Sequence, residues 1–299
     1  MKILVTGGAG FVGSNLAISL QDDHEVSVLD NFSSGDSHNL AGFDGNVITG
    51  DIRDAATVAK AGKPDVILHQ AAITDTTITD QGIVFSVNVE GFRNVLDYAI
   101  SKGIDLVYAS SAGVYGNGPV PMKEEESAPL NSYGFSKLAM DNLAKRHWDS
   151  GIKIIGLRYF NVFGPRERYK KKAASMIYQL ALQMAAGKSP RIFKHGEQMR
   201  DHIYVKDVVH ANLMAMNAKG NCIVNVGTGK ATSFNEVVGV LNEVLGKDLA
   251  PEYMDNPYQE GYQNNTQAST DNAEKLIGFG SKYSLQKGVQ EYLTEIGMI

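Results

Sequence analysis

The chain has little of several features that would assign it to a class directly. Its 299 residues include one cysteine, Cys222, so an internal disulfide is excluded and a reducing compartment is expected. The apolar neighbours of Cys222 predict a small core residue. The net charge of -5 leaves no basic surplus to neutralise phosphates, which argues against a nucleic-acid partner.

Long apolar stretches and metal-ligand patterns are missing too. No stretch approaches the roughly 18 apolar residues of a membrane span. The apolar run at the N-terminus breaks at Gly7, unlike a secretory signal. The seven histidines are scattered, and paired cysteines do not occur, so we expect no metal site. We therefore expect a cytoplasmic protein with no membrane partner.

What is present is strand–helix alternation through the first half of the chain. The expected strands are Lys2–Val5, Glu25–Leu29, Asn46–Ile48, Asp65–Leu68, Asp105–Ala109 and Lys153–Leu157. Gly13–Asp22, Val84–Lys102 and Ser132–Asp149 carry helical periodicity. Several strands are apolar at consecutive positions, as a sheet covered on both faces requires. The alternation predicts an α/β fold with a doubly wound parallel sheet.

The regular alternation of strands and helices ends after Arg158. Lys171–Ala186 is expected as a helix, Arg191–Phe193 as a short strand and 255–266 as a loop. Ser233 should begin a helix that runs to Leu245, because Glu236 three residues later completes a capping box. We expect a cofactor domain over 1–163, to which the chain returns near 203–226. Residues 164–299 should mainly form a smaller α/β lobe that binds substrate.

A glycine-rich turn follows the first expected strand and begins a helix at Gly7-Gly8-Ala9-Gly10-Phe11-Val12-Gly13. Glycines allow a tight turn and let a pyrophosphate approach the backbone, while the helix N-terminus supplies N–H groups. The spacing is G-x-x-G-x-x-G rather than G-x-G-x-x-G. An ordinary glycine turn is the alternative. The context favours a dinucleotide at Gly7, Gly10, Phe11, Val12 and Gly13.

Asp30 closes the second expected strand, where a carboxylate binds both ribose hydroxyls and repels a 2′-phosphate. No arginine or lysine occurs from Asp30 through Ile52, so NAD is predicted rather than NADP. The alternative for Asp30 is a turn residue before Asn31, which we also place at the cofactor. Asp51 and Ile52, after the third strand, should lie near the adenine.

Tyr133 and Lys137 are four residues apart and so lie on one side of a helix. There the ammonium group should lower the phenol's pKa from its reference value of about 10. Such a tyrosine exchanges a proton with a sugar or alcohol hydroxyl near neutral pH. A solvated helix face is the alternative. The pair predicts redox chemistry at a carbinol, with a nicotinamide taking the hydride.

Together the motifs resemble the extended short-chain dehydrogenase/reductase family over almost the whole chain. The resembling segments are TGGAGFVG, HQAA at 69–72, YASSAGVYG at 108–116, YGFSK at 133–137, RYFNVFGPRE at 158–167 and RDHIYVKDV at 200–208. The resemblance implies a Rossmann-type fold and a catalytic set in which Ser111 hydrogen-bonds the reacting oxygen, Tyr133 shuttles its proton and Lys137 binds the nicotinamide ribose. It further implies cofactor contacts at Gln70, Ala71, Ala72, Thr74, Asn88, Tyr133, Lys137 and Val162.

The family divides by reaction, and two positions bear on that division. Its nucleotide-sugar 4,6-dehydratases carry an Asp-Glu pair just before Val-Tyr-Gly, because loss of water needs an acid for the leaving hydroxyl. Here Ala112 and Gly113 stand there and cannot transfer protons. Epimerisation needs no such acid, since the carbinol is oxidised and then reduced on its other face. An NAD-dependent nucleotide-sugar epimerase is therefore expected.

The C-terminal half resembles the ADP-glycero-manno-heptose 6-epimerases. It does so at GPRERYK (164–170), Ala174-Ser175, Ser189-Pro190, VGTGKATSF (226–234) and GYQNNTQA (261–268). The resemblance makes Lys170 a second acid/base opposite the tyrosine. A solvated face or a diphosphate clamp stays open, because Lys170 belongs to a basic run. The implied substrate contacts are Ser111, Asn161, Lys172, Gln179, Phe193, Arg200 and Tyr262. For Tyr262, a lone aromatic in a loop, simple packing stays open.

Two departures keep other functions open. Lys172 and Gln179 stand where the heptose enzymes carry a serine and a histidine. The loop DNFSSG at 30–35 is more similar to that of UDP-hexose 4-epimerases, the enzyme alternative. A non-catalytic cofactor sensor is a distant alternative. The resemblance also implies a homodimer that pairs through Val84–Lys102 and Ser132–Asp149.

Overall fold

The computed structural model describes the whole chain except residues 77, 79 and 258–261. A large sheet has the strand order β10-β6-β5-β4-β1-β2-β3, and its neighbouring strands run parallel. Its strands are β1 (Lys2–Thr6), β2 (Glu25–Asp30), β3 (Asn46–Thr49), β4 (Val66–His69), β5 (Asp105–Ser111), β6 (Ile154–Tyr159) and β10 (Cys222–Val226). The predicted doubly wound parallel sheet is confirmed.

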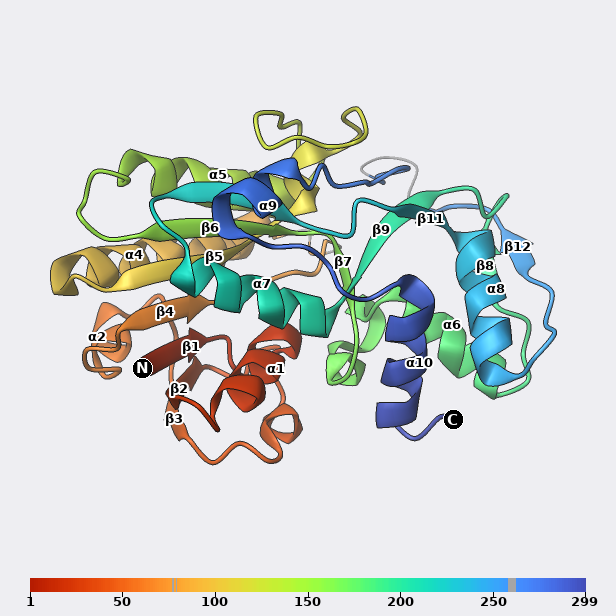
Figure 1. Cartoon of the computed structure of the whole chain (residues 1–299), viewed down its shortest axis with the longest axis horizontal. Coiled ribbons are helices and arrows are strands. Elements are labelled where there is room, and N and C mark those ends of the chain that lie inside the picture. The colour runs from red at the N-terminus through yellow and green to blue at the C-terminus, as the bar shows by residue number, and fades with distance from the viewer. Residues whose placement is uncertain (77, 79, 258–261) are drawn as a thin grey trace.

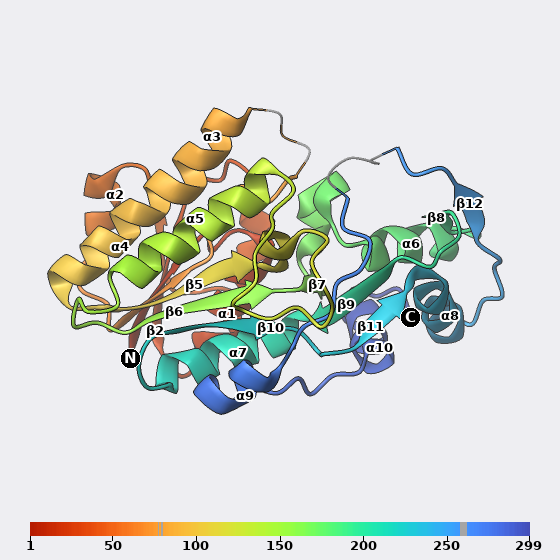
Figure 2. The same ribbon diagram turned by 90° about the horizontal axis from the view of Figure 1, so that it is seen from above.

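Both faces of this sheet are covered by helices (Figure 2). One face carries α3 (Gln81–Phe85), the π-helical turn η2 (Ser86–Glu90), α4 (Gly91–Lys102) and α5 (Ser132–Arg146), while α2 (Ala55–Ala59) packs on α4. The other face carries α1 (Phe11–Leu20), α7 (Val205–Asn217) and α9 (Asp271–Ile277). The apolar runs of the strands therefore face helices on each side, as their composition requires.

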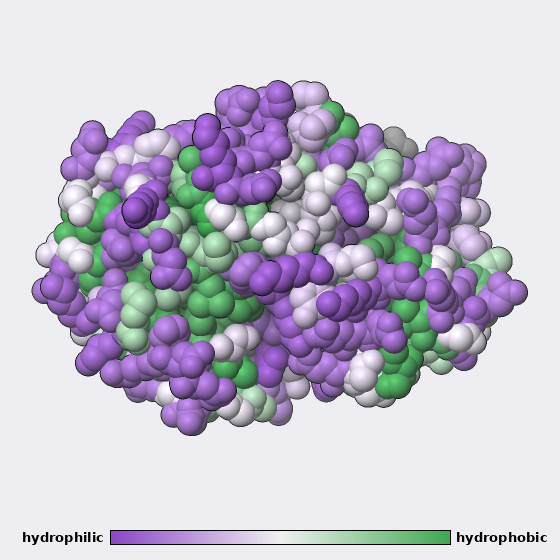
Figure 3. All heavy atoms as spheres, viewed as in Figure 1, coloured by the Kyte–Doolittle hydropathy of each residue, from purple (hydrophilic) through white to green (hydrophobic). Residues whose placement is uncertain are grey.

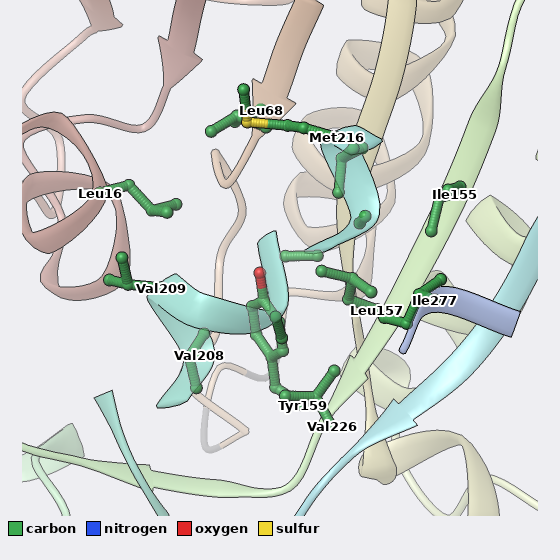
Figure 4. Packing of buried hydrophobic residues seen from close by; sticks show 14 of the residues in the cluster. Leu16, Leu68, Ile155, Leu157, Tyr159, Val208, Val209, Met216, Val226 and Ile277 are labelled. Atoms are coloured by element: carbon green, nitrogen blue, oxygen red, sulfur yellow. The ribbon is translucent and has the colours of Figure 1, made fainter. Parts of the chain in front are cut away.

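Alternate residues of one strand enter two different cores. Ile3 and Val5 of β1 pack with the α1 and α7 side, whereas Leu4 packs with the α4 and α5 side. In the first core, Leu16 of α1, Val209 of α7 and Leu157 of β6 come together (Figure 4). Burial on both faces fixes the register of the sheet, because a slip by one residue exchanges the two faces.

The remaining elements form a smaller α/β lobe beside the sheet (Figure 1). It has a three-stranded sheet of β11 (Ala231–Ser233), β9 (Met199–Tyr204) and β7 (Asn161–Phe163), and a parallel pair of β8 (Arg191–Phe193) and β12 (Glu252–Met254). Its helices α6 (Met176–Ala185), α8 (Phe234–Leu245) and α10 (Leu285–Glu295) share a third core. Short helical turns are η1 (Ser37–Leu40), η3 (Ala112–Tyr115) and η4 (Glu167–Ala173).

Several local predictions can be compared with this structure. The helix expected over Lys171–Ala186 is wrong at its start. Lys171 has a left-handed φ of 53°, and the Ser175 side chain caps a helix that begins at Met176. The capping box of Ser233 and Glu236 is confirmed. In the expected loop, residues 255–257 and 262–266 form no helix or named strand, and 258–261 lie outside the described residues.

The chain does return to the large sheet after Ile203, because α7 packs on it and β10 pairs with β6. Helix α9 then packs on β10 and α7. The division into domains at residue 163 stays a prediction. Hydrophilic side chains cover most of the face in Figure 3, and hydrophobic ones gather over α7. Within the described residues, no helix has the length and apolarity to cross a membrane.

Candidate active site

A cleft opens where the strand order reverses, beside the carboxyl ends of β1 and β4. In such sheets the loops that follow the two strands diverge there and leave a crevice. The residues that line it are Gly7, Gly10, Leu29, Asp30, Asn31, Ser33, Ser34, Gly35, Gly50, Asp51, Ile52, Gln70, Ala71, Ala72, Ile73 and Val87. Nine of the predicted cofactor residues are among them: Gly7, Gly10, Asp30, Asn31, Asp51, Ile52, Gln70, Ala71 and Ala72.

The glycine turn allows segments of backbone to approach each other closely. Gly7 has a φ of +69°, and a Cβ there would lie 2.6 Å from the backbone nitrogen of Ala71. A Cβ at Gly13 would lie 2.1 Å from the carbonyl oxygen of Gly7. Phe11, Val12 and Gly13 form the first turn of α1, and no hydrogen bond within the described part of the chain uses their N–H groups. This turn fits a pyrophosphate held by backbone amides at a helix N-terminus.

Asp30, at the end of β2, lines the same cleft beside the glycine turn. Its carboxylate accepts hydrogen bonds from the N–H groups of Ala9 and Phe32, both at 2.8 Å. Burial raises the pKa of Asp30, and these two bonds oppose that rise. Each oxygen has a further lone pair for a ribose hydroxyl. A carboxylate at this place fits the adenosine ribose of NAD and disfavours a 2′-phosphate.

Asp51 is held in place on the neighbouring loop. Arg53 donates to both its oxygens, at 3.0 and 2.7 Å, and Asn31 donates at 2.9 Å. The hydrogen bonds from Arg53 hold the pKa of Asp51 well below its usual range. Arg53 follows directly on the stretch that has no basic residue. Its bidentate pairing with Asp51 uses the guanidinium group that could otherwise contact a cofactor phosphate.

The other predicted cofactor residues do not line the cleft. Asn88, in the π-helical turn, is fully buried. Its side chain bonds both backbone groups of Ile73 and the hydroxyl of Ser136. Thr74 is exposed just beyond Ile73, and Val162 packs between two cores. Contacts from Asn88, Thr74 and Val162 to the cofactor stay predictions.

Ser111, Tyr133 and Lys137 are brought together by β5 and α5. The side chain of Ser111 acts on Tyr133, since it lowers the pKa of the phenol. The Nζ atom of Lys137 lies 5.9 Å from the centroid of the Tyr133 ring. Gly113 adjoins both side chains, because a Cβ there would lie 3.3 Å from Ser111 Oγ and 3.4 Å from Tyr133 Cε1. The three side chains thus lie close together, and their role in proton transfer to a carbinol oxygen stays a prediction.

The prediction that Lys137 lowers the pKa of the Tyr133 phenol is wrong in this structure. Burial raises the pKa of Tyr133, and the hydrogen bond with Ser111 opposes that rise. Lys137 is 2% exposed and donates at 2.7 Å to the carbonyl oxygen of Ala109 rather than to the phenol. Burial also lowers the pKa of Lys137 to about 8.

Lys170 lies on η4, over the start of α1. Its Nζ is 5.7 Å from the centroid of the Phe11 ring. The side chain is half-buried; burial lowers its pKa, and the charges of Glu167 and Asp75 oppose that change. Glu167 is fully buried and accepts hydrogen bonds from Gly164 and Ser175, which fixes both ends of the segment that carries Lys170.

Three of the predicted substrate residues meet in the smaller lobe. The guanidinium carbon of Arg200 lies 4.9 Å from the ring centroid of Tyr262, which packs edge-on against Phe193 at 5.7 Å. Arg200 is buried and donates to the carbonyl oxygens of Met199, Gln263 and Asn264. A second ring, that of Phe234, has its centroid 5.9 Å from the same guanidinium carbon, and a cation beside two aromatic rings suits a charged ligand with a planar group.

Asn161 reaches the same region through Thr266, to which it donates at 2.9 Å. Lys172 and Gln179 lie apart from the aromatic cluster, on η4 and α6. Lys172 is exposed, and Gln179 donates to the carbonyl oxygens of Lys172 and Ala174. Their contact with substrate stays a prediction.

Some residues that line the cleft were not predicted from the sequence as cofactor contacts. Ser33, Ser34 and Gly35 line it, and a Cβ at Gly35 would lie 2.9 Å from that of Ala9. The signal was available, since three small residues follow the ribose carboxylate within the segment DNFSSG. Ile73 and Val87 carry no such signal, because apolar residues of this kind are common in cores.

Residues 3–227 match the model of the NAD dependent epimerase/dehydratase family. The chain belongs to that family. It is therefore an enzyme whose cofactor is NAD, in agreement with the glycine turn and Asp30. The chain is 36% identical to an ADP-L-glycero-D-manno-heptose-6-epimerase of Brachyspira hyodysenteriae, over 97% of this chain and 96% of that one.

Two solved structures are similar over nearly the whole chain. One is the crystal structure of ADP-L-glycero-D-manno-heptose-6-epimerase from Helicobacter pylori, with a TM-score of 0.93 and 42% identity, covering 100% of this chain and 96% of that one. The other is UDP-glucose 4-epimerase of Thermotoga maritima with UDP-glucose, with a TM-score of 0.90 and 30% identity, covering 99% of each chain. The relatives thus include enzymes of both kinds that the sequence left open.

Proposed function

We propose that this enzyme epimerises a nucleoside diphosphate sugar, and that its substrate is an ADP-glycero-manno-heptose inverted at C6. The observation that carries the choice is Lys170, a half-buried amine over the start of α1 that is separate from Tyr133. The similarity to two heptose epimerases supports it. A reaction that uses both faces of a side-chain ketone needs a proton donor on each.

In this mechanism Ser111 hydrogen-bonds the reacting oxygen and Tyr133 takes its proton. NAD bound in the cleft would supply the hydride acceptor for the sugar carbon. Lys137 keeps a positive charge beside the phenol. When the ketone presents its other face, Lys170 donates the proton to the new hydroxyl. Its pKa is lowered by burial, which brings proton transfer closer to neutral pH. Arg200, between Tyr262 and Phe234, would hold the diphosphate.

The test is product analysis by NMR after incubation with the two C6 epimers of ADP-glycero-manno-heptose, and separately with UDP-glucose and UDP-galactose. We expect only the heptose epimers to interconvert. Lys170→Met should lower kcat by about 10²- to 10⁴-fold, the usual contribution of one acid/base group. Lys171→Met removes the same charge from an exposed neighbour and should change kcat less than about twofold. If Lys170→Met raises KM and leaves kcat unchanged, Lys170 is a diphosphate clamp.

The second candidate is a UDP-hexose 4-epimerase. The observation in its favour is the small-residue segment Ser33–Gly35 in the cleft, together with the similarity to the Thermotoga maritima enzyme. Such an enzyme turns the whole sugar and reuses Tyr133. Interconversion of UDP-glucose and UDP-galactose alone would establish it. Tyr133→Phe should abolish epimerisation under both candidates, because each uses its phenol for proton transfer.

Retention of the cofactor is a separate expectation. An epimerase regenerates NAD in every turnover, so we expect native mass spectrometry of the purified protein to show NAD bound to the chain. A protein that takes up NADH and a sugar only transiently would be a reductase that releases its cofactor.

We also propose that two copies pair through α3, α4 and α5. These helices lie together on one face (Figure 2), and two of them carry exposed phenylalanines, Phe85 at 37% and Phe135 at 51%. Light scattering during size exclusion should give a dimer that Phe135→Glu dissociates. Leu182→Glu on α6, where the leucine is 44% exposed, is the matched control and should stay dimeric. A wild-type monomer would rule out the pairing.

We place the enzyme in the cytoplasm, and cell fractionation tests this.

A further inference from the structure

Asp141 is a buried carboxylate on α5 that no step of the proposed mechanism uses. It follows Lys137 by four residues and therefore lies on the same side of the helix. Both side chains are inside the protein, with Asp141 at 0% and Lys137 at 2% exposure. A carboxylate is almost never buried to this degree unless it is paired, so its partners define what it does.

The carboxylate is fixed from two neighbouring strands. Tyr108 of β5 donates its hydroxyl to Oδ1 at 3.0 Å, and Arg158 of β6 donates Nε–H to Oδ2 at 2.9 Å. Gly156, which pairs with Tyr108 across the sheet, makes room for the phenol, because a Cβ there would lie 2.5 Å from its oxygen. The sheet is thus shaped around this contact.

Arg158 is held as firmly as the carboxylate it contacts. It is 1% exposed, and its Nη1 donates to the hydroxyl of Tyr115 at 2.9 Å and to the carbonyl oxygen of Glu124 at 3.0 Å. Tyr115 in turn donates to Asn225 of β10 at 2.6 Å. The carboxylate therefore has a fixed place relative to β5, β6 and β10.

Few other titratable groups face this pair. Lys137 faces Tyr133 and Asp141 on its own helix and His69 of β4. Asp141 faces Tyr108 and Arg158, beyond which lie Tyr115 and Glu124. His69 is neutral at neutral pH, since burial lowers its pKa to about 3, and burial raises the pKa of both Tyr108 and Tyr115. Asp141 is thus the anion whose attraction opposes the loss of charge by Lys137.

We propose that Asp141 is a positioning residue for Lys137: fixed by Arg158 and Tyr108, its carboxylate keeps the ammonium group charged and seated at Ala109, beside the catalytic tyrosine. Burial by itself favours the neutral amine. A neutral Lys137 would leave Tyr133 without its neighbouring cation. The effect of Asp141 on catalysis rests on the proposed function, whereas its effect on the charge of Lys137 does not.

The experiment replaces Asp141 with asparagine and titrates Lys137 directly. Protein labelled with ¹³C at lysine Cε gives the pKa of Lys137 by NMR, with Lys137→Met to assign its resonance. We expect Asp141→Asn to lower this pKa by about 1–2 pH units, as the loss of one opposite charge implies at the usual spacing of about 6 Å between helical residues i and i+4 and an effective dielectric constant of about 20–40. The alkaline limb of the kcat/KM profile should move to lower pH by the same amount.

Two further variants separate charge from packing. Tyr108→Phe removes one hydrogen bond to Asp141 and keeps the charge, so it should leave both the Lys137 pKa and the alkaline limb within about 0.3 pH units of wild type, a small fraction of the shift expected from a lost charge. Asp141→Asn leaves Arg158 buried without its anion, which by itself strongly destabilises a folded protein. If Asp141→Asn does not fold, Asp141→Asn/Arg158→Met, which removes both charges, should still lower the Lys137 pKa, by less than the loss of Asp141 alone, because the lost Arg158 cation offsets part of the effect.

The outcomes are distinct. If thermal stability falls while the Lys137 pKa and the alkaline limb stay at their wild-type values, Asp141 is purely structural and the proposal is overturned. If the pKa falls as expected but wild type epimerises no nucleotide sugar, the proposed function fails and the coupling of Asp141 to Lys137 stands. Asp141→Glu should restore the wild-type pKa at least in part, since it restores the charge.

Discussion

Two buried histidines make the stability of this protein depend on pH between 7 and 5. His69 is 1% exposed and His202 is 6% exposed. Burial lowers the pKa of each to about 3, with the charge of Lys137 adding to the effect at His69 and that of Arg200 at His202. In the unfolded chain both should titrate near 6.5. As the pH falls through 6.5, the unfolded state takes up protons that the folded state does not.

The sign and size follow from this difference. A depressed folded-state pKa stabilises the protein above the unfolded-state value, and this stabilisation is lost as pH falls toward the folded-state value. Between pH 7 and pH 5 each histidine should remove about 1.9 kcal/mol from the free energy of unfolding, and the two together about 4 kcal/mol. That is a large share of the roughly 5–15 kcal/mol typical of native proteins.

The assay is urea unfolding at pH 7.0 and pH 5.0 for wild type and for His69→Gln/His202→Phe. Glutamine can keep a hydrogen bond with Thr6, whose hydroxyl lies 2.8 Å from His69 Nδ1. Phenylalanine suits His202, since its ring packs edge-on against Phe234 and its Nδ1 has no partner within the described residues. Carboxylates contribute equally to both proteins. The loss between the two pH values should be smaller in the variant by about 4 kcal/mol. An equal loss in both proteins would refute the reasoning.

Three further outcomes are expected. Gly13→Ala should abolish NAD binding and lower stability, because its Cβ would lie 2.1 Å from the carbonyl oxygen of Gly7. Gly239→Ala, in a helix with open space around it, should instead raise stability by about 0.5–1 kcal/mol. The absorbance of bound NAD and the midpoint of unfolding check these two outcomes. Asp30→Ser should raise the affinity for NADP relative to NAD, measured by calorimetry, and unchanged preference would contradict the role of the carboxylate. Ser233→Ala should lower the free energy of unfolding by about 1 kcal/mol through loss of the helix cap, and a change below the error of the unfolding curves would contradict it.

The cofactor half of the fold was predictable because its signals are local. Each strand from β1 to β6 is a short apolar run, and the glycine turn and Asp30 stand at fixed offsets from β1 and β2. Strand β9 gives no such signal. It buries Arg200, Asp201 and His202, and the Asp201 carboxylate is satisfied by Thr228, Gly229 and Ala268. Partners that distant in sequence cannot be inferred from the residues of the strand.

The difference between local signals and partners distant in sequence also explains the errors in the candidate site. Spacing along α5 placed Tyr133 and Lys137 on one side of the helix, but it could not show that the carbonyl oxygen of Ala109 takes the ammonium group's hydrogen bond. The helix expected from Lys171 ignored the left-handed conformation of that residue. Nor does helical spacing show which groups hold the Asp141 carboxylate, because Tyr108 and Arg158 come from two other strands.

The late arrival of β10 in the large sheet has a consequence for synthesis on the ribosome. Until Cys222–Val226 has emerged, β6 is an unprotected edge with the apolar side chains of Ile154, Ile155 and Leu157. An open edge of this kind recruits strands of other chains. A nascent chain that stalls after β6 should therefore aggregate or engage a chaperone, and a gene fragment that ends at residue 163 should be insoluble even though it contains the whole glycine turn.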